Sequence, residues 1–219
     1  MNASLPLVVV AHHRETCGGA LPALLKPLGQ VSTVHALEGQ PLPDLAGVGG
    51  VVLLGSHHCV LDESIPGLTE EMRWVERALA NNVPMMGICF GAQMMARVAG
   101  ARIYVGAQPE IGPCQVTPAP GQDWMPQAME VMQWHHDGIA QVPSGAQRIA
   151  RGTSAFEEQA FVMGNALGVQ FHPETTPAML RRWTSRCPHS ASYEDLAQSL
   201  ERMHAMQGWL KAVVERLFR

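Results

Sequence analysis

The 219-residue sequence has no surplus of positive charge, no long apolar run and no regular pattern of cysteines. Its formal net charge is -4. A protein that binds nucleic acid needs a basic surface, so we expect no nucleic-acid partner. No segment approaches the roughly 18 apolar residues of a membrane-spanning helix, and we expect no membrane partner. The short apolar run near the N-terminus has no basic segment before it, which argues against a signal peptide.

The cysteines are few and widely scattered, and their odd number does not suggest a disulfide framework. They are Cys17, Cys59, Cys89, Cys114 and Cys187. Free thiols persist in a reducing compartment, so we predict a cytoplasmic location. Apart from Cys89, these cysteines have no base motif that matches them, and we interpret them as structural.

The pattern of apolar residues predicts one domain spanning residues 1–219, which is long enough to bury a core of its own. Two apolar runs, LPLVVVAHH and GGVVLLGSHH, each end in a histidine pair. Buried parallel strands that deliver polar residues to one sheet edge have this pattern. Further strands are expected at 31–35 and 83–88. The first half therefore predicts an α/β fold with a mainly parallel central sheet and flanking helices.

Two helices are predicted in the first half from apolar spacing and from end signals. The first is expected to take Ser64 as its N-cap, to hold Pro66 in its first turn and to end near Asn81. The second is expected over 92–99, with Gly100 just beyond its end.

Between residues 101 and 171, short β-like segments alternate with turn residues, which predicts a β-rich second half. The chain then returns to helix, because Ser192 and Asp195 form a capping-box pattern and apolar residues continue at helical spacing to Leu217. We therefore expect a core at about 6–182 and a C-terminal helical segment at about 190–219.

One cysteine lies in a segment that favours chemistry, PMMGICFGAQMM. Cys89 stands between Gly87 and Gly91, where an apolar strand turns directly into a helix, and such an elbow presents a nucleophile above a sheet. The positive end of the following helix favours a thiolate. The backbone N–H of Phe90 points to where an oxyanion forms during acyl transfer. A small buried cysteine in a tight turn is the alternative.

A second segment, GVQFHPE, supplies a base and its orienting group. His172 ends an apolar strand and Glu174 follows two residues later, so both side chains point to the same side of an extended backbone. The carboxylate is then placed to hold one imidazole nitrogen while the other nitrogen faces a thiol. Gly55, at the end of the neighbouring strand, is expected to offer a second N–H to the oxyanion.

These segments resemble the class I glutamine amidotransferases. GICFGAQ at 87–93 is similar to the nucleophile motif of that family, and GVQFHPE at 168–174 is similar to its His-Glu motif. PEIG at 109–112 and WHHD at 134–137 resemble the amidotransferase domain of GMP synthase and its stand-alone relatives. The resemblance covers roughly 6–182 and implies the family's flavodoxin-like architecture.

The resemblance implies a glutaminase reaction. Cys89 would attack the side-chain amide of glutamine, ammonia would leave, and water would release the γ-glutamyl thioester. His172 would relay the protons and Glu174 would orient it, while Gly55 and Phe90 would supply the oxyanion N–H groups. No cofactor is implied.

The resemblance also implies a glutamine pocket, in which one residue would answer the α-ammonium group of the substrate. That residue would be Asp137, for which capping of a turn before Gly138 is the alternative. The complete set of implied substrate-binding residues is Gln93, Trp134, His135, His136 and Asp137.

No Gly-rich phosphate loop and no synthetase domain is recognisable in the sequence. The chain would therefore either pass ammonia to a separate synthetase or acceptor subunit, or act alone as a γ-glutamyl peptide or amide hydrolase. A catalytically silent binding or regulatory module on the same fold is a third alternative, against which the intact Cys89, His172 and Glu174 argue. The sequence predicts no oligomeric state.

A metal site is the remaining alternative, because imidazole and a thiolate such as that of Cys59 suit zinc. The histidines that suggest a metal site form three pairs, His12-His13, His57-His58 and His135-His136. No ligand spacing matches a known site and adjacent histidines rarely reach one ion, so we expect no metal.

Overall fold

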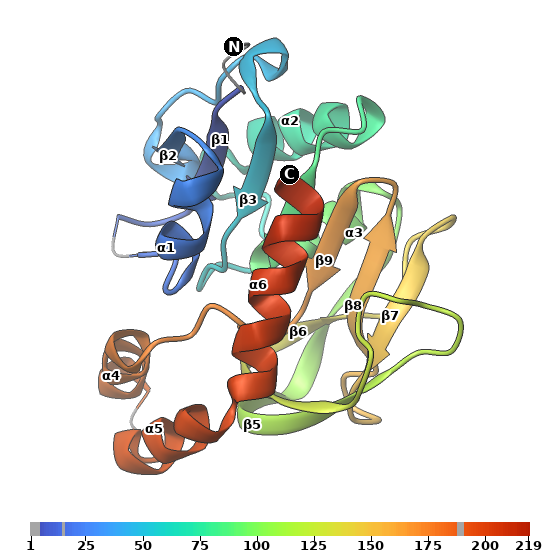
Figure 1. Ribbon diagram of the computed structural model, residues 1–219. Coiled ribbons are helices and arrows are strands. Elements are labelled where there is room, and N and C mark those ends of the chain that lie inside the picture. The colour runs from blue at the N-terminus through green and yellow to red at the C-terminus, as the bar shows by residue number, and fades with distance from the viewer. Residues whose placement is uncertain (1–4, 15, 188–190) are drawn as a thin grey trace.

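The computed structural model describes residues 5–14, 16–187 and 191–219 (Figure 1). Its strands form one sheet in the order β2-β1-β3-β4-β9-β8-β7-β5-β6. The first five strands in that order pair in parallel. Their bounds are Val31–His35 for β2, Leu7–Ala11 for β1, Gly50–Leu53 for β3, Met85–Ile88 for β4 and Ala166–Val169 for β9.

The other four strands are antiparallel and belong to the β-rich second half. Residues 103–118 form one long strand, β5, where the sequence predicts separate short β-like segments, and the register of β5 against β6 shifts between Val105 and Glu110. The bounds are Glu158–Met163 for β8, Gln147–Arg151 for β7, Ile103–Pro118 for β5 and Met129–Ile139 for β6.

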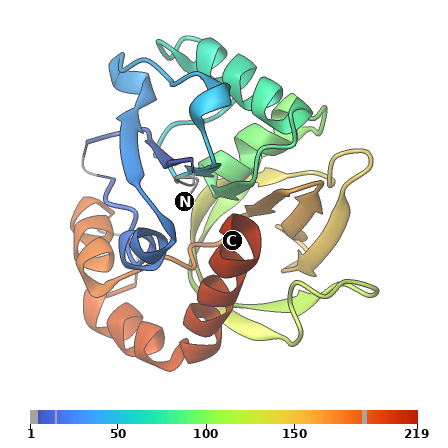
Figure 2. The same cartoon turned by 45° about the horizontal axis from the view of Figure 1, so that its top comes forward.

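Helices cover both faces of the parallel strands, because alternate side chains of a strand point to opposite sides. In β1, Val8 and Val10 pack in the core cluster that contains residues of α2 (Leu68–Ala80) and α3 (Phe90–Val98). Leu7 and Val9 pack in the other cluster, with α1 (Leu21–Leu25) and α6 (His204–Phe218). Figure 2 shows the orange and red C-terminal helices on the opposite side from the green helices.

The sequence predicts some ends of the two helices in the first half correctly and others wrongly. The N-cap prediction at Ser64 is wrong, because α2 starts after Gly67, which has a φ of 81°, and the Ser64 hydroxyl donates to Asp62 instead. The predicted end near Asn81 is confirmed. Helix α3 starts two residues earlier than expected, and Gly100 follows its end with a φ of +85°.

The C-terminal part contains more helices than the sequence pattern indicates. Helix α4 (Pro177–Arg186) was not expected, although Thr176 caps it and Pro177 occupies its first turn. The capping box is confirmed, since Ser192 accepts a hydrogen bond from the Asp195 N–H. The expected single helix is divided at Met203 into α5 (Tyr193–Arg202) and α6.

The described residues also form short 3-10 helices at Lys26–Leu28, Ala36–Glu38 and Leu45–Gly47. No helix in residues 5–14, 16–187 and 191–219 is long and apolar enough to cross a membrane.

Candidate active site

Cys89 lies at a strained turn between β4 and α3. Its φ of 51° and ψ of -108° fall in a region that non-glycine residues rarely adopt. Its N–H donates to the carbonyl of Val169 on β9 at 2.8 Å. A Cβ atom on Gly87 would lie 2.8 Å from the Ala92 nitrogen, and one on Gly91 would overlap Leu53. Close packing therefore requires both flanking glycines, as the sequence predicts for an elbow.

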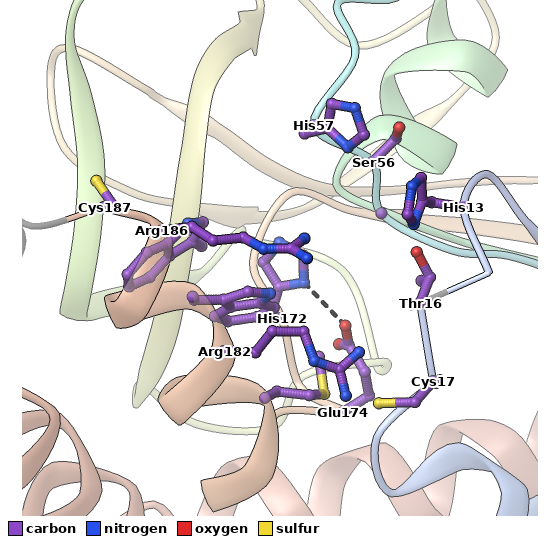
Figure 3. Close-up of a pocket in the computed structure, with 14 residues that line it drawn as sticks. His13, Thr16, Cys17, Ser56, His57, His172, Glu174, Arg182, Arg186 and Cys187 are labelled. Carbon is purple, nitrogen blue, oxygen red and sulfur yellow. Dashed lines mark hydrogen bonds and ion pairs between the residues drawn. The ribbon is translucent and has the colours of Figure 1, made fainter.

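His172 and Glu174 form a buried pair just beyond β9. The His172 Nδ1 atom lies 2.8 Å from Glu174 Oε1, as the spacing of the two residues predicts (Figure 3). Gly55, at the end of β3, closes the group, since a Cβ atom on it would lie 2.8 Å from His172 Cε1 and 3.6 Å from Cys89 Cβ. Three strand ends therefore bring the thiol, the imidazole and the Gly55 backbone to one place.

The charge state of His172 follows from its neighbours. Burial alone would lower the pKa of the imidazole. The negative charges of Glu174 and Cys89, together with hydrogen bonds to both side chains, outweigh burial and raise the pKa of His172 to about 10. At neutral pH the imidazole therefore carries a proton that it can donate.

A glycine pair before α1 supports Glu174 from outside. Ala20 N–H donates to the Glu174 carbonyl at 2.9 Å. Gly19 has a φ of +55°, and a Cβ atom there would overlap that same carbonyl. Only glycine allows this approach of the two backbones. Gly19 thus has a packing role that its sequence context does not reveal.

A second buried pair, which sequence reasoning missed, lies behind the oxyanion residues. His12 Nε2 is 2.8 Å from Glu71 Oε1, and both side chains are fully buried. The His12 ring contacts Phe90 edge-on at a centroid distance of 4.6 Å, and its Nδ1 lies 3.5 Å from the Gly55 carbonyl oxygen. His12 therefore touches both residues expected to supply oxyanion N–H groups.

Gln93 lies one helical turn after Cys89 and is buried. Its side-chain nitrogen donates to the Asp137 carbonyl at 2.9 Å and lies 3.3 Å from Gln170 Oε1. The Asp137 carboxylate lies 3.6 Å from His136 Nδ1, and it adds to the effect of burial in raising the pKa of the Cys59 thiol. Gln93 and Asp137, both predicted to bind substrate, therefore lie next to each other, one helical turn from Cys89.

The PEIG and WHHD segments meet across β5 and β6 in a buried polar network. His135 Nε2 lies 3.1 Å from Glu110 Oε2, and its Nδ1 lies 3.1 Å from the Asp137 carbonyl oxygen. Thr153 and Gln159 also donate to Glu110. Burial raises the pKa of the Glu110 carboxyl, but the hydrogen bonds and the charge of His135 hold it below its usual value. Both ring nitrogens of His135 therefore have protein partners.

A pocket of about 650 Å³ opens beside the His172–Glu174 pair. Trp134, one of the predicted substrate-binding residues, lines it together with residues of α4. The Trp183 ring of α4 stands 4.9 Å from the His172 ring and 5.1 Å from the Trp134 ring. The unexpected helix α4 thus forms one wall of the candidate site.

Among the described residues, the remaining thiols and histidines do not assemble a metal centre. Burial raises the pKa of the Cys114 thiol to about 11, and burial and Asp137 raise that of Cys59. His57 lies 5.7 Å from His13 and 4.2 Å from His58, between ring centroids. Within the part of the chain that the structure describes, no group of three or more His, Cys, Asp or Glu residues is placed to hold a metal ion.

Comparisons with known proteins identify the family of the chain. The family model "Glutamine amidotransferase class-I" matches residues 34–182, more than half of the chain. A GMP synthase [glutamine-hydrolyzing] of Schizosaccharomyces pombe is 31% identical over 153 residues, which are 65% of this chain and 26% of that protein. A gamma-glutamyl-L-1-hydroxyisopropylamide hydrolase of Pseudomonas sp. is 24% identical over 189 residues, 76% of this chain and 63% of that protein.

Solved structures confirm the predicted α/β fold and architecture. A glutamine amidotransferase from Thermotoga maritima has a TM-score of 0.91 and 27% identity, with all of both chains covered. One from Methylobacillus flagellatus has a TM-score of 0.90 at 21% identity, covering 98% of this chain and 94% of that one. The chain spans only about a quarter of the GMP synthases that it matches. On the family model, the chain belongs to the class-I glutamine amidotransferases.

Proposed function

We propose that the protein hydrolyses the side-chain amide of glutamine through a γ-glutamyl thioester on Cys89 and releases ammonia. The observation that carries the proposal is the strained elbow of Cys89 next to the hydrogen-bonded His172–Glu174 pair. These groups supply a nucleophile, a proton carrier and an orienting carboxylate, which is the arrangement that acyl transfer requires.

In the first half-reaction the Cys89 sulfur adds to the amide carbon. The N–H groups of Gly55 and Phe90 stabilise the oxyanion. His172 gives its proton to the amide nitrogen, the C–N bond breaks, and ammonia leaves with the γ-glutamyl thioester remaining. Addition removes the negative charge from the sulfur, and that charge contributes to the raised pKa of His172. The imidazolium therefore becomes a stronger acid when the leaving group needs its proton.

In the second half-reaction water takes the place of ammonia. Neutral His172 removes a proton from water, the oxygen adds to the thioester carbon, and the C–S bond breaks to give glutamate and free Cys89. Glu174 holds Nδ1 throughout, so that Nε2 faces the reacting atoms. Splitting amide hydrolysis into two steps lowers the barrier of each.

The predicted substrate-binding residues are proposed to hold the glutamyl half of the substrate. Gln93 and Asp137 are joined by a hydrogen bond close to the elbow, and Trp134 lines the adjacent pocket. His136 is half exposed beside the Asp137 carboxylate, and His135 braces the same strand through Glu110. The carboxylate of Asp137 is the proposed partner of the α-ammonium group.

Ammonia is proposed to pass to a separate synthetase or acceptor subunit. The match to a glutamine-hydrolysing GMP synthase, of which this chain spans 26%, supports that destination. The cysteine usage supports a cytoplasmic setting.

A second candidate function is hydrolysis of a larger γ-glutamyl amide by the chain acting alone. Two observations favour it. The chain spans 63% of the length of a γ-glutamyl amide hydrolase, and the pocket of about 650 Å³ lies within the range of about 300–1,000 Å³ that holds drug-sized ligands. The chemistry at Cys89 is the same in both functions.

The test is the replacement Cys89→Ser. We expect turnover of glutamine to fall by about four orders of magnitude or more, because the nucleophile is lost. Cys114→Ser is the matched control, since burial raises the pKa of that thiol to about 11 and the residue does not line the pocket. A Cys89→Ser enzyme that releases ammonia at the wild-type rate would disprove the proposal, because Cys89 would then not be the nucleophile.

A further inference from the structure

We propose that His12, held by Glu71, positions the two backbone segments that supply the proposed oxyanion N–H groups. This role builds on the proposed function, because it belongs to the same acyl-transfer site. His12 is a positioning residue, since it acts on the reacting atoms through Gly55 and Phe90. It should therefore stabilise the transition state, in which the oxyanion exists, and have little effect on the binding of the substrate.

Three neighbouring strands bring His12 to the two oxyanion segments. Strands β1, β3 and β4 lie side by side in parallel, and their carboxyl ends meet at one edge of the sheet. His12 follows β1 directly, while Gly55 and Phe90 each come two residues after the end of their strands. The Leu54 N–H donates to the Val10 carbonyl at 3.0 Å, so the pairing with β1 continues up to the residue before Gly55. The sheet itself therefore places His12 beside both segments.

The His12 ring contacts the two segments in different ways. It meets the Phe90 ring edge-on, with the ring centroids 4.6 Å apart and an angle of 64° between the ring planes. Phe90 is the first residue of α3 and is completely buried, so this contact holds the start of that helix. The Nδ1 atom of His12 lies 3.5 Å from the Gly55 carbonyl oxygen. Gly55 has no side chain to fix its own peptide groups, so a donor at its carbonyl restrains them.

Glu71 decides whether the His12 ring can donate to Gly55. Nε2 lies 2.8 Å from Glu71 Oε1, so both ring nitrogens face oxygen atoms that accept hydrogen bonds. A neutral ring with its proton on Nε2 would turn the Nδ1 lone pair toward the Gly55 carbonyl and leave the Glu71 charge buried without a counter-charge. With a second proton on the ring, or with the shared proton on Glu71, the pair is neutral overall. Nδ1 then carries a hydrogen atom and donates to Gly55.

The surroundings of the pair are apolar, which argues against a role in stability alone. Neither the His12 nor the Glu71 side chain has any exposed surface. On α2, Glu71 lies between Leu68 and Val75, and both of these belong to the buried cluster that also contains Phe90. The Glu71 Oε2 atom has no hydrogen-bond partner among the described residues. Apolar side chains of similar volume often stabilise a fold better than such a buried pair. The pair is therefore better explained by the placement of His12.

The two ring nitrogens are tested separately by His12→Asn and His12→Gln. The amide nitrogen of asparagine can replace Nδ1 toward Gly55, whereas that of glutamine can replace Nε2 toward Glu71. We expect His12→Gln to lower kcat for glutamine roughly 10- to 100-fold and to leave KM within about threefold, because the oxyanion exists only in the transition state. We expect His12→Asn to recover most of that loss.

His35→Asn is the matched control, because His35 ends the adjacent strand β2 and pairs with Ala11, the residue before His12. We expect it to leave kcat unchanged. An equal loss of kcat in His12→Asn and His12→Gln would overturn the inference, since the donor to Gly55 would then not matter. A loss that appears in KM and not in kcat would overturn it as well.

Two reactions of the Cys89 thiol separate positioning of the oxyanion groups from a general disturbance of the site. Acetylation by p-nitrophenyl acetate passes through an oxyanion, whereas alkylation by iodoacetamide does not. In His12→Gln we expect acetylation of Cys89 to slow roughly tenfold or more, while its alkylation stays within about twofold of the wild-type rate. Equal slowing of both reactions would overturn the inference, because His12 would then act on the thiol or on the fold.

Urea unfolding of each variant shows whether the fold is intact. His12→Gln keeps a partner for Glu71, so we expect it to fold. Should it fail to fold, the double variant His12→Leu with Glu71→Leu removes the pair without leaving a buried charge, and it takes the place of His12→Gln in every assay with the same expected results. A double variant that also fails to fold would overturn the inference, because the pair would then serve the fold.

Absence of glutamine turnover in the wild-type protein would contradict the proposed function, and the two thiol reactions then carry the test of His12. Acetylation of Cys89 that is lost selectively in His12→Gln supports the inference without any turnover of glutamine. Equal loss of acetylation and alkylation overturns it, and so does a wild-type protein whose Cys89 is not acetylated by p-nitrophenyl acetate.

Discussion

At the residue scale, the protonation of His172 links the stability of the site to pH. Its folded pKa of about 10 lies above the ordinary value of 6.5. The stabilisation that it provides is therefore complete below about pH 6.5, and it is lost as the pH rises through about 10. Glu174 and Cys89 both contribute to the raised pKa, so changing either one should move this window.

The first prediction concerns Glu174→Gln. The amide keeps a hydrogen-bond acceptor near Nδ1 but removes the negative charge, so the pKa of His172 should fall. We expect the basic limb of the pH profile of kcat/KM to move to lower pH. We also expect the loss of activity to be smaller than in His172→Ala, because the base carries the proton, whereas the carboxylate orients the base and adjusts its pKa.

Steady-state measurements between pH 5 and about pH 10.5 test this prediction across the range in which His172 titrates. If the basic limb stays in place, the Glu174 charge does not set the pKa of the imidazole. If Glu174→Gln is the more damaging change, the two roles are assigned the wrong way round.

Residues whose partners are close in sequence could be predicted, and residues with remote partners could not. The hydrogen bond of His172 to Glu174 spans two residues, and the elbow of Cys89 is defined by its own flanking glycines. The His12–Glu71 pair spans 59 residues and joins β1 to α2. No sequence pattern links His12 to Glu71, so the sequence indicates His12 only as part of a histidine pair.

At the element scale, the loop before α1 holds the segment that carries Glu174. Gly18 and Gly19 both have positive φ values, so alanine at either position strains the backbone by roughly 1–2 kcal/mol. Their surroundings differ. A Cβ atom on Gly19 overlaps the Glu174 carbonyl, whereas one on Gly18 makes ordinary contacts at 3.6 Å or more.

The second prediction follows from this difference. Gly19→Ala should displace the Glu174 backbone and lower kcat/KM at least about tenfold, because small displacements of catalytic groups have large effects on rate. Gly18→Ala serves as the matched control, with a similar strain and kcat/KM within a few-fold of wild type. Urea unfolding measures the stability of both variants. Equal activity of the two alanine variants would show that the contact with Glu174 has no catalytic consequence.

Helices and strands with a clear apolar pattern could be predicted from the sequence. The exact ends of helices, and a helix with few buried residues, could not. Strands β1, β3 and β4 follow from apolar runs, and α3 follows from its spacing. Serine favours the N-cap position, which predicts a cap at Ser64, yet Gly67 supplies the positive φ with which α2 begins. Helix α4 was missed because only Met179 and Leu180 are buried in it, which is too few apolar residues to reveal a period.

At the scale of the whole molecule, α6 joins the two halves of the sheet. Figure 1 shows this helix running across the sheet face. Trp209 lies 5.5 Å from the Phe171 ring, next to His172, and its Nε1 donates to the Trp124 carbonyl at 2.6 Å. At the end of α6, Phe218 packs so closely on Gly50 of β3 that a Cβ atom there would lie 2.5 Å from it.

The third prediction is that Trp209→Ala lowers the free energy of unfolding by about 3–5 kcal/mol, as loss of a large buried aromatic side chain does. We also expect the remaining transition to stay single and cooperative, since residues 1–219 are predicted to form one domain. Lys211→Ala, an exposed change on the same helix, is the control and should have almost no effect. Two separate transitions in either variant would contradict the one-domain prediction.

The α/β class of the molecule could be predicted because it depends on local period, while the order of the strands could not. The pairing of β4 with β9 brings Met85 beside Ala166, and no local pattern reveals such a distant pair. The same holds for β5, whose two ends were read as separate strands. The meeting of the strand ends at Cys89, Gly55 and His172 was inferred from general rules of parallel sheets and from the family resemblance.

The central claim is that Cys89 becomes the acyl carrier, and trapping of the intermediate tests it most directly. The protein is mixed with glutamine, quenched in acid within the first turnovers and digested, and the peptides are analysed by mass spectrometry. The account predicts a γ-glutamyl adduct on the peptide that contains Cys89, absent from Cys89→Ser and present in Cys114→Ser. Release of ammonia from glutamine without any adduct on Cys89, or with the adduct on another cysteine, would contradict it.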